Sequence, residues 1–540
     1  MARASASGAS GSNDSSLRGS AASSPGRMPK GESPPDSPVA GGGRSEGRSV
    51  SRPPARLAVR TQLASRAAAL VGRTSRALRR GDGTVIGGQV ALAIDPHALG
   101  KLAAGRLVVL VSGTNGKTTT TKLLAESVGA RSAVLTNEGG ANLPGGLVAA
   151  LATGARGAPA VLEVDEGYLG MVAEVVAPGA IVLLNLSRDQ LDRVSEVRMQ
   201  ADKWRAALAR LKAVHVVANC DDPLVVWAAS AAATVTWVAG GQSWRGDSAG
   251  CPRCSGRLVY AASDGWSCAC GFDRPDPDVW VEGGVMHMKV AAPGPTTAPG
   301  PTKVPGPTTV PRPTAAVAPR GTAVESWPID LPLPGRCNLS NASMAAAAAK
   351  LMGVDVAESI AAMAKVDEVA GRYGAFQLDG VEVRMLLAKN PAGWMELLDL
   401  LAGGSRPLVV AINARIADGQ DPSWLWDVPF ERLAGRRVVA SGARCWDLAV
   451  RLTYANVPHI TTPNLPGAIV AAGEPVVDFA GNYTAFQDLR AHMRRARSGV
   501  VPAVSTDGDQ SMPAERGPAT SRRPAAEPAA VGTEKPEELR

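Results

Sequence analysis

Residues 107–120 read LVVLVSGTNGKTTT, an apolar run that ends in a turn with two glycines and a lysine. Leu107 to Val111 are β-prone and predict a strand, and the polar run from Lys117 predicts a helix. Such a loop is typical of a phosphate site, because backbone N–H groups and a helix N-terminus face the anion. The spacing departs from G-x-x-x-x-G-K-[ST], whose first glycine would fall at Val111. We predict nucleotide binding here, with a plain structural turn as the alternative.

Within this loop, Lys117 is expected to reach the terminal phosphates and the Thr118 hydroxyl to hold Mg²⁺. The predicted nucleotide-binding residues are Gly113, Thr114, Asn115, Gly116, Lys117, Thr118 and Thr119.

A second strand, Ala160 to Leu162, leads into the acidic run 163–166. Carboxylates at the end of a parallel strand lie on the edge where ligands bind. Mg²⁺ is usually held by one or two carboxylates plus phosphate oxygens. Glu163 is therefore the predicted second magnesium ligand, and Asp165 and Glu166 are interpreted as its solvated neighbours.

Three stretches of the 540 residues have few large apolar side chains: 1–54, 291–323 and 499–540. They cannot bury enough apolar surface to offset chain entropy, which predicts two disordered tails and one Pro-rich linker. The remaining residues, 55–290 and 324–498, are long enough for two substantial cores.

The net charge of +8 is concentrated at the N-terminus, where residues 1–80 carry fourteen Lys and Arg against four Asp and Glu. Ala55 to Arg80 is expected to form an amphipathic helix, either packed on the domain, which we prefer, or touching an anionic membrane surface. No apolar run approaches a membrane span, and no secretory signal is evident. A cytoplasmic location is expected, with the inner face of the cell membrane as a further site.

Four of the seven cysteines form a C-x-x-C and a C-x-C pair, a strong signal for tetrahedral zinc. They are Cys251, Cys254, Cys268 and Cys270, in a zinc ribbon expected over about residues 246–275. With four thiolates no position is open for chemistry, so a structural role is preferred. The rival function is a zinc-ribbon nucleic-acid-binding NTPase, but nearby arginines are offset by aspartates, and we expect no nucleic-acid partner.

The motif order GTNGKTTT, NEGGAN, LEVDEG, NLSRDQLDR, NCDDP resembles the central domain of the Mur ligases. These enzymes activate a carboxylate as an acyl phosphate and couple it to an amine. The ribbon, RDQLDR, LLAKNPAG (386–393), ADGQDPSW (417–424) and AGNYTAF (480–486) narrow the resemblance to the MurT-type synthetase subunits of lipid II isoglutaminyl synthase. The resemblance covers about residues 55–290 and 324–490.

The implied fold class is α/β: a P-loop ATP-binding central domain with an inserted zinc ribbon, then a C-terminal Rossmann-like α/β domain. The implied reaction of peptidoglycan biosynthesis is ATP-dependent amidation of the α-carboxylate of D-glutamate in the lipid II stem peptide, giving D-isoglutamine. The implied cofactors are ATP, Mg²⁺ and Zn²⁺. The implied partners are lipid II at the membrane surface and a GatD-type glutaminase that forms a heterodimer and supplies ammonia.

The resemblance also carries over two single residues. Asn338 matches the nucleotide-contacting asparagine of G-x-x-N-x-x-N-A, whereas helix capping explains Asn341 equally well. Asp421 is the predicted catalytic residue, because the family places on this subunit the carboxylate that orients the glutaminase histidine. Asp418 is the alternative, and a turn-forming aspartate of local role is the other interpretation. The family's carbamylated lysine has no secure counterpart, Lys203 being only in the region.

Overall fold

The computed structural model describes residues 59–77, 84–137, 140–188, 197–261, 265–291, 322–367 and 373–497. All of these belong to one compact unit, residues 54–540. The expected tails and the linker residues 292–321 lie outside the described residues.

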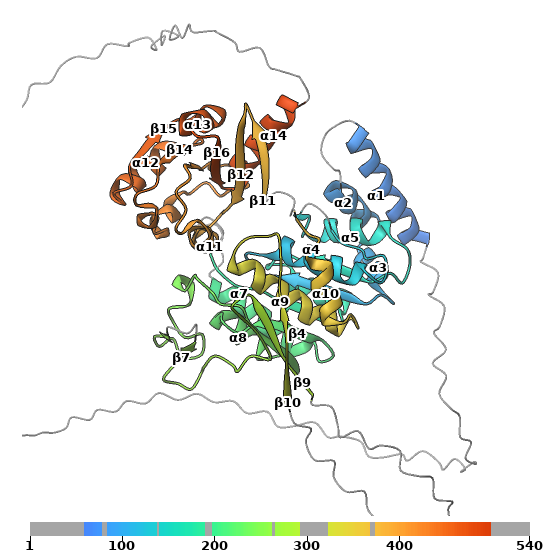
Figure 1. The fold of residues 1–540 in the computed structure, drawn as a ribbon. Helices are drawn as coiled ribbons and strands as arrows, with labels where there is room; N and C mark the ends of the chain where they lie inside the picture. The colour runs from blue at the N-terminus through green and yellow to red at the C-terminus, as the bar shows by residue number, and fades with distance from the viewer. Residues whose placement is uncertain are drawn as a thin grey trace, which may run out of the picture. The chain divides into compact units, whose positions relative to one another are not determined.

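An eight-stranded mixed sheet organises the first part of the chain (Figure 1). Its order is β10-β9-β8-β5-β4-β3-β1-β2, parallel from β2 to β8 and antiparallel at β9 and β10. The strands are β1 (Val108–Ser112), β2 (Ala160–Glu163), β3 (Ala180–Leu183), β4 (His215–Asn219), β5 (Thr234–Ala239), β8 (Val279–Glu282), β9 (Val285–Ala291) and β10 (Thr322–Pro328). The two strands expected at Leu107–Val111 and Ala160–Leu162 are therefore present, as β1 and β2.

Helices cover both faces of this sheet, which explains why β1 is buried at every position. Val108 and Leu110 enter one core, and Val109 and Val111 enter the other. The first core is closed by α1 (Val59–Ala77), α2 (Thr84–Ile94), α3 (Ala98–Ala103), α5 (Pro144–Thr153), α6 (Leu169–Val176), α7 (Val197–Arg210) and α8 (Pro223–Ala229). The second is closed by α4 (Lys117–Gly129), α9 (Arg336–Leu351) and α10 (Val356–Met363).

A second mixed sheet, of six strands, has the order β11-β12-β16-β13-β14-β15, with only β11 antiparallel. Its strands are β11 (Tyr373–Leu378), β12 (Val381–Leu387), β13 (Leu408–Ala411), β14 (Val438–Ser441), β15 (His459–Thr461) and β16 (Val476–Gly481). One face packs against α11 (Pro391–Leu401), η3 (Ser423–Asp427), η4 (Phe430–Leu433) and α12 (Cys445–Tyr454). The other packs against α13 (Leu465–Ala472) and α14 (Tyr483–Arg497). The predicted α/β class is confirmed.

The division of the chain differs from the expected one at residue 324. β10 pairs with β9 along its whole length, and α9 and α10 pack into the second core of the first sheet. The segment 322–366 therefore continues the first sheet and its cover, and the second sheet begins only at β11.

Between β5 and β8 the chain leaves the sheet and forms a small insertion. It contains η2 (Gly246–Ser248) and the two-stranded sheet of β6 (Val259–Tyr260) and β7 (Trp266–Ser267). Leu258, Trp266 and Phe272 pack into a satellite core with Cys220, which follows β4. The insertion is thus attached to the first sheet through apolar contacts.

Candidate functional site

The loop between β1 and α4 has a backbone that only glycine suits at two positions. Gly113 has φ 149° and Gly116 has φ 85°. A Cβ at Gly113 would lie 2.9 Å from Leu184 Cβ, and one at Gly116 would lie 2.7 Å from Asn341 Oδ1. Both the conformation and the close neighbours exclude a side chain here. The loop therefore turns tightly into the N-terminus of α4.

The residues after β3 hold this loop in place. The Thr114 amide donates to the Asn185 carbonyl oxygen at 2.9 Å, and the Asn115 amide donates to Asn185 Oδ1 at 2.9 Å. Thr114 Oγ1 donates to the Ser187 carbonyl oxygen at 3.0 Å. These contacts join the first and fourth of the sequence motifs, although residues 189–193 of the fourth lie outside the described part of the chain.

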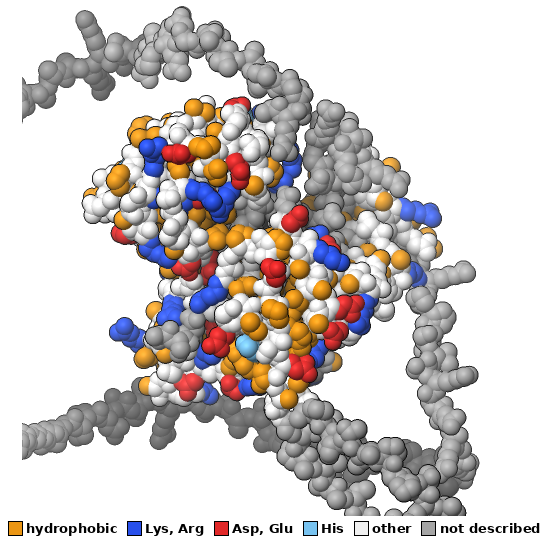
Figure 2. Space-filling model, in the orientation of Figure 1, with side chains coloured by type: hydrophobic (Ala, Val, Ile, Leu, Met, Phe, Trp, Pro, Cys, Tyr) orange, Lys and Arg blue, Asp and Glu red, His pale blue; other side chains and the backbone are white. Residues whose placement is uncertain are grey.

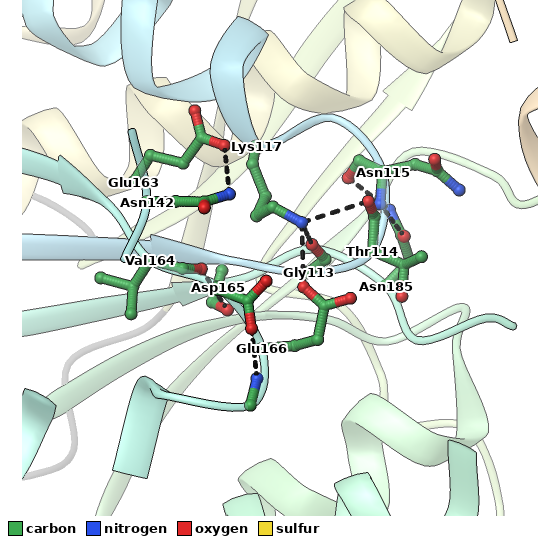
Figure 3. A network of polar contacts seen from close by, with 12 residues as sticks. Gly113, Thr114, Asn115, Lys117, Asn142, Glu163, Val164, Asp165, Glu166 and Asn185 are labelled. Carbon is green, nitrogen blue, oxygen red and sulfur yellow. Dashed lines mark hydrogen bonds and ion pairs between the residues drawn. The ribbon is translucent and has the colours of Figure 1, made fainter. Parts of the chain in front are cut away.

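Lys117 lies across its own loop (Figure 3). Its Nζ donates to the Gly113 carbonyl oxygen at 2.5 Å and pairs with Glu166 Oε2 at 2.9 Å. The lysine side chain is only 5 % exposed. A buried ammonium beside loop carbonyls and a carboxylate is where phosphate oxygens would approach in a phosphate loop.

Glu166 is more than the solvated neighbour that its sequence context indicated. Its carboxylate pairs with Lys117, and its backbone carbonyl oxygen accepts hydrogen bonds from Gln200 and from Trp204 Nε1, both on α7. Both donors lie on the buried side of α7, whereas Lys203 is exposed. The structure therefore gives no support to Lys203 as a carbamylated lysine.

Thr118 and Glu163, the two predicted magnesium ligands, are in contact. Thr118 Oγ1 donates to Glu163 Oε2 at 2.8 Å, and Asn142 Nδ2 donates to the other carboxylate oxygen at 3.2 Å. Asn137 brackets the backbone of Glu163 with two bonds of 2.8 Å. Adjacent ligands of an octahedral Mg²⁺ ion with bonds of about 2.0–2.1 Å lie about 2.9 Å apart. The separation of these oxygens fits that requirement.

A cavity of about 120 Å³ opens beside the loop. It is lined by Asn115 and Gly116 from the loop and by Asn338 and Asn341 from α9, among others. Asn338 is 1 % exposed and donates to the Pro334 carbonyl oxygen at 2.6 Å, while accepting from Asn341 at 3.3 Å. Asn341, for which helix capping was an equally good interpretation, is the asparagine whose side chain lies against Gly116.

Asn390, from the motif at 386–393, also reaches the loop, and the sequence interpretation did not assign it. Its side-chain amide exchanges two hydrogen bonds with that of Asn115, at 3.2 and 3.3 Å. It also caps α11 by accepting from the Gly393 amide at 2.8 Å. The motif itself was the only available signal, because 275 residues separate the two asparagines.

The four predicted zinc ligands come together in the insertion between β5 and β8. Their Sγ atoms all lie within 4.8 Å of one another. Cys251 and Cys270 are 3.7 Å apart, and Cys254 and Cys268 are 3.5 Å apart. Ligands of a tetrahedral ion with Zn–S bonds of about 2.3 Å lie about 3.8 Å apart. The cluster therefore has the spacing of a tetrathiolate metal site.

The two candidate aspartates of the loop at 417–424 have different surroundings. Asp418 is 4 % exposed and accepts hydrogen bonds from the backbone amide and the hydroxyl of Thr484. Asp421 is exposed and accepts a local bond of 2.8 Å from the Ser423 amide. The bonds from Ser423 lower the pKa of Asp421. Asp418 thus ties its loop to the start of α14, whereas Asp421 faces outward.

Two family descriptions match the chain. The Mur ligase middle domain matches residues 111–244, and the MurT ligase C-terminal domain matches residues 387–486. The chain thus carries both a Mur ligase middle domain and a MurT ligase C-terminal domain. It is accordingly a ligase, and the family resemblance predicted from its motifs is confirmed.

Named relatives extend the match over most of the chain. A lipid II isoglutaminyl synthase (glutamine-hydrolysing) subunit MurT of Staphylococcus aureus is 27 % identical, covering 80 % of this chain and 97 % of that protein. The subunit of the same name from Streptococcus pneumoniae is 28 % identical, covering 72 % and 86 %.

Among solved structures, a pseudomurein peptide ligase type C from Methanothermus fervidus has a TM-score of 0.52 at 19 % identity, covering 72 % of this chain and 79 % of that one. MurF from Acinetobacter baumannii has a TM-score of 0.50 at 16 % identity, covering 75 % and 80 %. These likenesses establish a Mur ligase-like fold.

Proposed function

We propose that this chain is the synthetase subunit of a lipid II isoglutaminyl synthase. It would use ATP to amidate the α-carboxylate of D-glutamate in the lipid II stem peptide, giving D-isoglutamine. The observation that carries the proposal is the phosphate loop, in which Lys117, Thr118 and Glu163 meet at the end of β1 and β2. The names of the two MurT relatives supply the substrate.

In the proposed mechanism, the loop amides and the Lys117 ammonium bind the terminal phosphates of ATP. A Mg²⁺ ion held by Thr118 and Glu163 would neutralise charge on those phosphates. The substrate carboxylate attacks the γ-phosphorus, the bond to the β-phosphate oxygen breaks, and ADP leaves. Ammonia then attacks the acyl carbon, phosphate departs with the bonding pair, and the nitrogen loses a proton to give the amide.

We assign the cavity beside the loop to the nucleoside part of ATP. Asn338 and Asn341 bring amide groups to it from α9, and Asn115, which bonds to Asn390 at the start of α11, brings one from the loop. Amides that can both donate and accept are suited to nucleotide hydroxyls and ring nitrogens. Because Asn390 bonds to Asn115, a contact from the second sheet would be coupled to the phosphate loop.

We assign zinc to the four cysteines, as a closed structural site. The sulfur spacing fits tetrahedral coordination, and four thiolates leave no position for a reacting water. The backbone amides of Arg253 and Gly256 donate to the Cys251 and Cys254 sulfurs at 3.4 Å each. The bond from Gly256 lowers the pKa of Cys254 to about 7, which favours its thiolate form. The ion would fix the insertion against the satellite core.

We propose that ammonia comes from a GatD-type glutaminase partner and that Asp421 orients the catalytic histidine of that partner. Asp421 is exposed, and its lowered pKa keeps the carboxylate ionised, as an orienting group requires. The residues on either side of this loop expose apolar side chains that a partner could cover, with Ile416 86 % and Trp426 55 % exposed. Asp418 is buried and bonded within the chain, which argues against it for this role.

The test compares ATP turnover with three candidate stimulants: lipid II with an ammonium salt, lipid II alone and a polynucleotide. Proposed amidation requires strong stimulation by lipid II with ammonium, and Lys117→Ala should abolish it while leaving the melting temperature close to that of the wild type. Stimulation by the polynucleotide instead would favour a nucleic-acid-dependent NTPase and refute the proposal.

A further inference from the structure

Helix α1 packs on the rest of the molecule through its small side chains. Thr61, Ala64 and Ala68 are 0, 1 and 7 % exposed. α2 approaches α1 so closely that a Cβ at Gly87 would lie 2.6 Å from the Ala68 carbonyl oxygen. Thr61 also donates to Asp95, at 2.5 Å. Of the large apolar side chains of α1, Val71 is half-buried and the other three are left out of this packing.

Those large side chains form a stripe on the opposite side of α1. Val59, Leu63 and Leu70 are 73, 53 and 65 % exposed. At 3.6 residues per turn these three positions fall within about 40° of one another around the helix axis. We call these three residues the α1 stripe. The sequence favoured an amphipathic helix packed on the domain, but in the structure these three side chains face the solvent.

The exposed charged side chains described beside the stripe are basic. Arg60 and Arg66 on α1 and Arg156 after α5 are exposed, whereas Asp95, which accepts from Thr61, is buried. On the face drawn in Figure 2, by contrast, basic and acidic side chains are interspersed over the described surface. A groove of about 230 Å³ beside α1 is lined by Arg66, Arg106 and Arg156, among others.

The groove is held in shape by its own hydrogen bonds. Arg106 donates to the carbonyl oxygens of Ala155 and Ala158 at 2.7 and 3.1 Å, which fixes the segment that bears Arg156. Burial, together with the nearby charge of Arg156, lowers the pKa of Arg106. Guanidinium groups gathered in this way are suited to the oxygens of a phosphate.

We propose that the α1 stripe and this groove dock on an anionic lipid bilayer, with the stripe in the interfacial layer and the groove receiving a lipid phosphate. An exposed apolar stripe flanked by arginines is the pattern of helices that lie in the membrane interface. The choice of a membrane rests on the proposed function, because lipid II is a membrane lipid.

Two other occupants lack charge complementarity with this surface. Residues 1–54 of the same chain carry seven Lys and Arg against four Asp and Glu, so they would repel it. A second copy of the chain would present the same arginines. An acidic bilayer, by comparison, offers both negative charge and an apolar layer.

The experiment measures sedimentation of the full chain with phosphatidylcholine vesicles and with vesicles that also contain phosphatidylglycerol, without ATP. We expect binding to the anionic vesicles that weakens as salt rises. Leu63→Ser combined with Leu70→Ser should weaken it at least tenfold. Arg66→Gln should weaken it about fivefold, the usual effect of one basic side chain near such a surface. Val470→Ser is the matched control, because Val470 is 63 % exposed on α13.

Equal binding of the leucine variant and the wild type would overturn the proposal, as would equal binding to neutral and anionic vesicles. Binding to single-stranded DNA as tight as to anionic vesicles, and independent of the leucines, would assign the surface to nucleic acid instead. Amidation of detergent-dispersed lipid II is measured in parallel. Amidation without vesicle binding refutes only the docking surface, and vesicle binding without amidation refutes only the proposed function.

Discussion

Replacing Glu163 by glutamine tests the metal-binding half of the phosphate loop. The carboxylate is 2 % exposed and accepts from Thr118 and Asn142. Glutamine has the same shape, and its amide can accept from Asn142 and donate to Thr118. Because both contacts can be replaced, we expect the free energy of unfolding to change by less than about 1 kcal/mol.

The effect on catalysis should be much larger, because the variant removes one of two proposed protein ligands of Mg²⁺. Mutating a residue that contacts a metal ligand, rather than the metal itself, typically lowers metal affinity or activity about 10–100-fold. Because Glu163 is proposed to bind Mg²⁺ directly, we expect its replacement to lower kcat at least a hundredfold. This corresponds to a loss of about 2.7 kcal/mol of transition-state stabilisation. The amidation rate should also require a higher Mg²⁺ concentration for half-saturation.

The assay follows amide formation against Mg²⁺ concentration for the wild type, Glu163→Gln and Glu126→Gln. Glu126 is the control because it lies on α4 but is 43 % exposed and pairs with Lys122 on the surface. Exposed pairs of this kind contribute about 0.3–0.5 kcal/mol, so this variant should behave as the wild type. Near wild-type activity of Glu163→Gln at low Mg²⁺ would refute the assignment.

Three further changes have defined outcomes. Purified protein should contain about one zinc ion per chain, and metal analysis that finds no zinc would contradict this. Cys251→Ser combined with Cys254→Ser should remove the ion and lower the melting temperature before the chemistry changes, since closed thiolate sites act through folding. Asp421→Asn should retain complex formation with the glutaminase and lose glutamine hydrolysis, while amidation with added ammonium persists; normal glutamine hydrolysis would exclude the shared site. The hydrogen bond from Thr61 lowers the pKa of Asp95 to about 2 in the folded protein, whereas the pKa of an aspartate in the unfolded chain is near 4. Ionised Asp95 should therefore stabilise the fold at pH values above about 4 and lose that effect as the pH falls towards 2. Urea unfolding at several pH values should show Thr61→Val to be less sensitive to that fall, and an unchanged pH dependence would contradict the assignment.

The phosphate loop and its acidic neighbour could be predicted from sequence for a physical reason. β1 and β2 are adjacent parallel strands, so the residues that follow them emerge at the same edge of the sheet. Thr118 and Glu163 meet for that reason, although 45 residues separate them. The cysteine cluster could be predicted because thiolate pairs at such spacing have few other uses.

Contacts between distant segments could not be predicted in the same way. β10 follows the Pro-rich stretch 292–321, whose composition gives no sign that the next strand returns to the first sheet. The predicted domain boundary at residue 324 therefore falls inside β10, which pairs with β9. The bond between Asn115 and Asn390 depends on how α11 meets the loop, which no local pattern encodes. Periodicity predicted the amphipathic helix of α1, but the close approach of α2 selects its small residues for the buried side.

The most direct test of the central claim is mass spectrometry of lipid II after incubation with this chain, a GatD-type glutaminase, ATP, Mg²⁺ and glutamine. We predict that the α-carboxylate of the D-glutamate residue exchanges its hydroxyl for an amino group, with one ADP formed per amide. Lys117→Ala, assayed in the same way, should give no amide. An unmodified stem peptide in the presence of ATP turnover, or amide formed equally without ATP, would contradict the account.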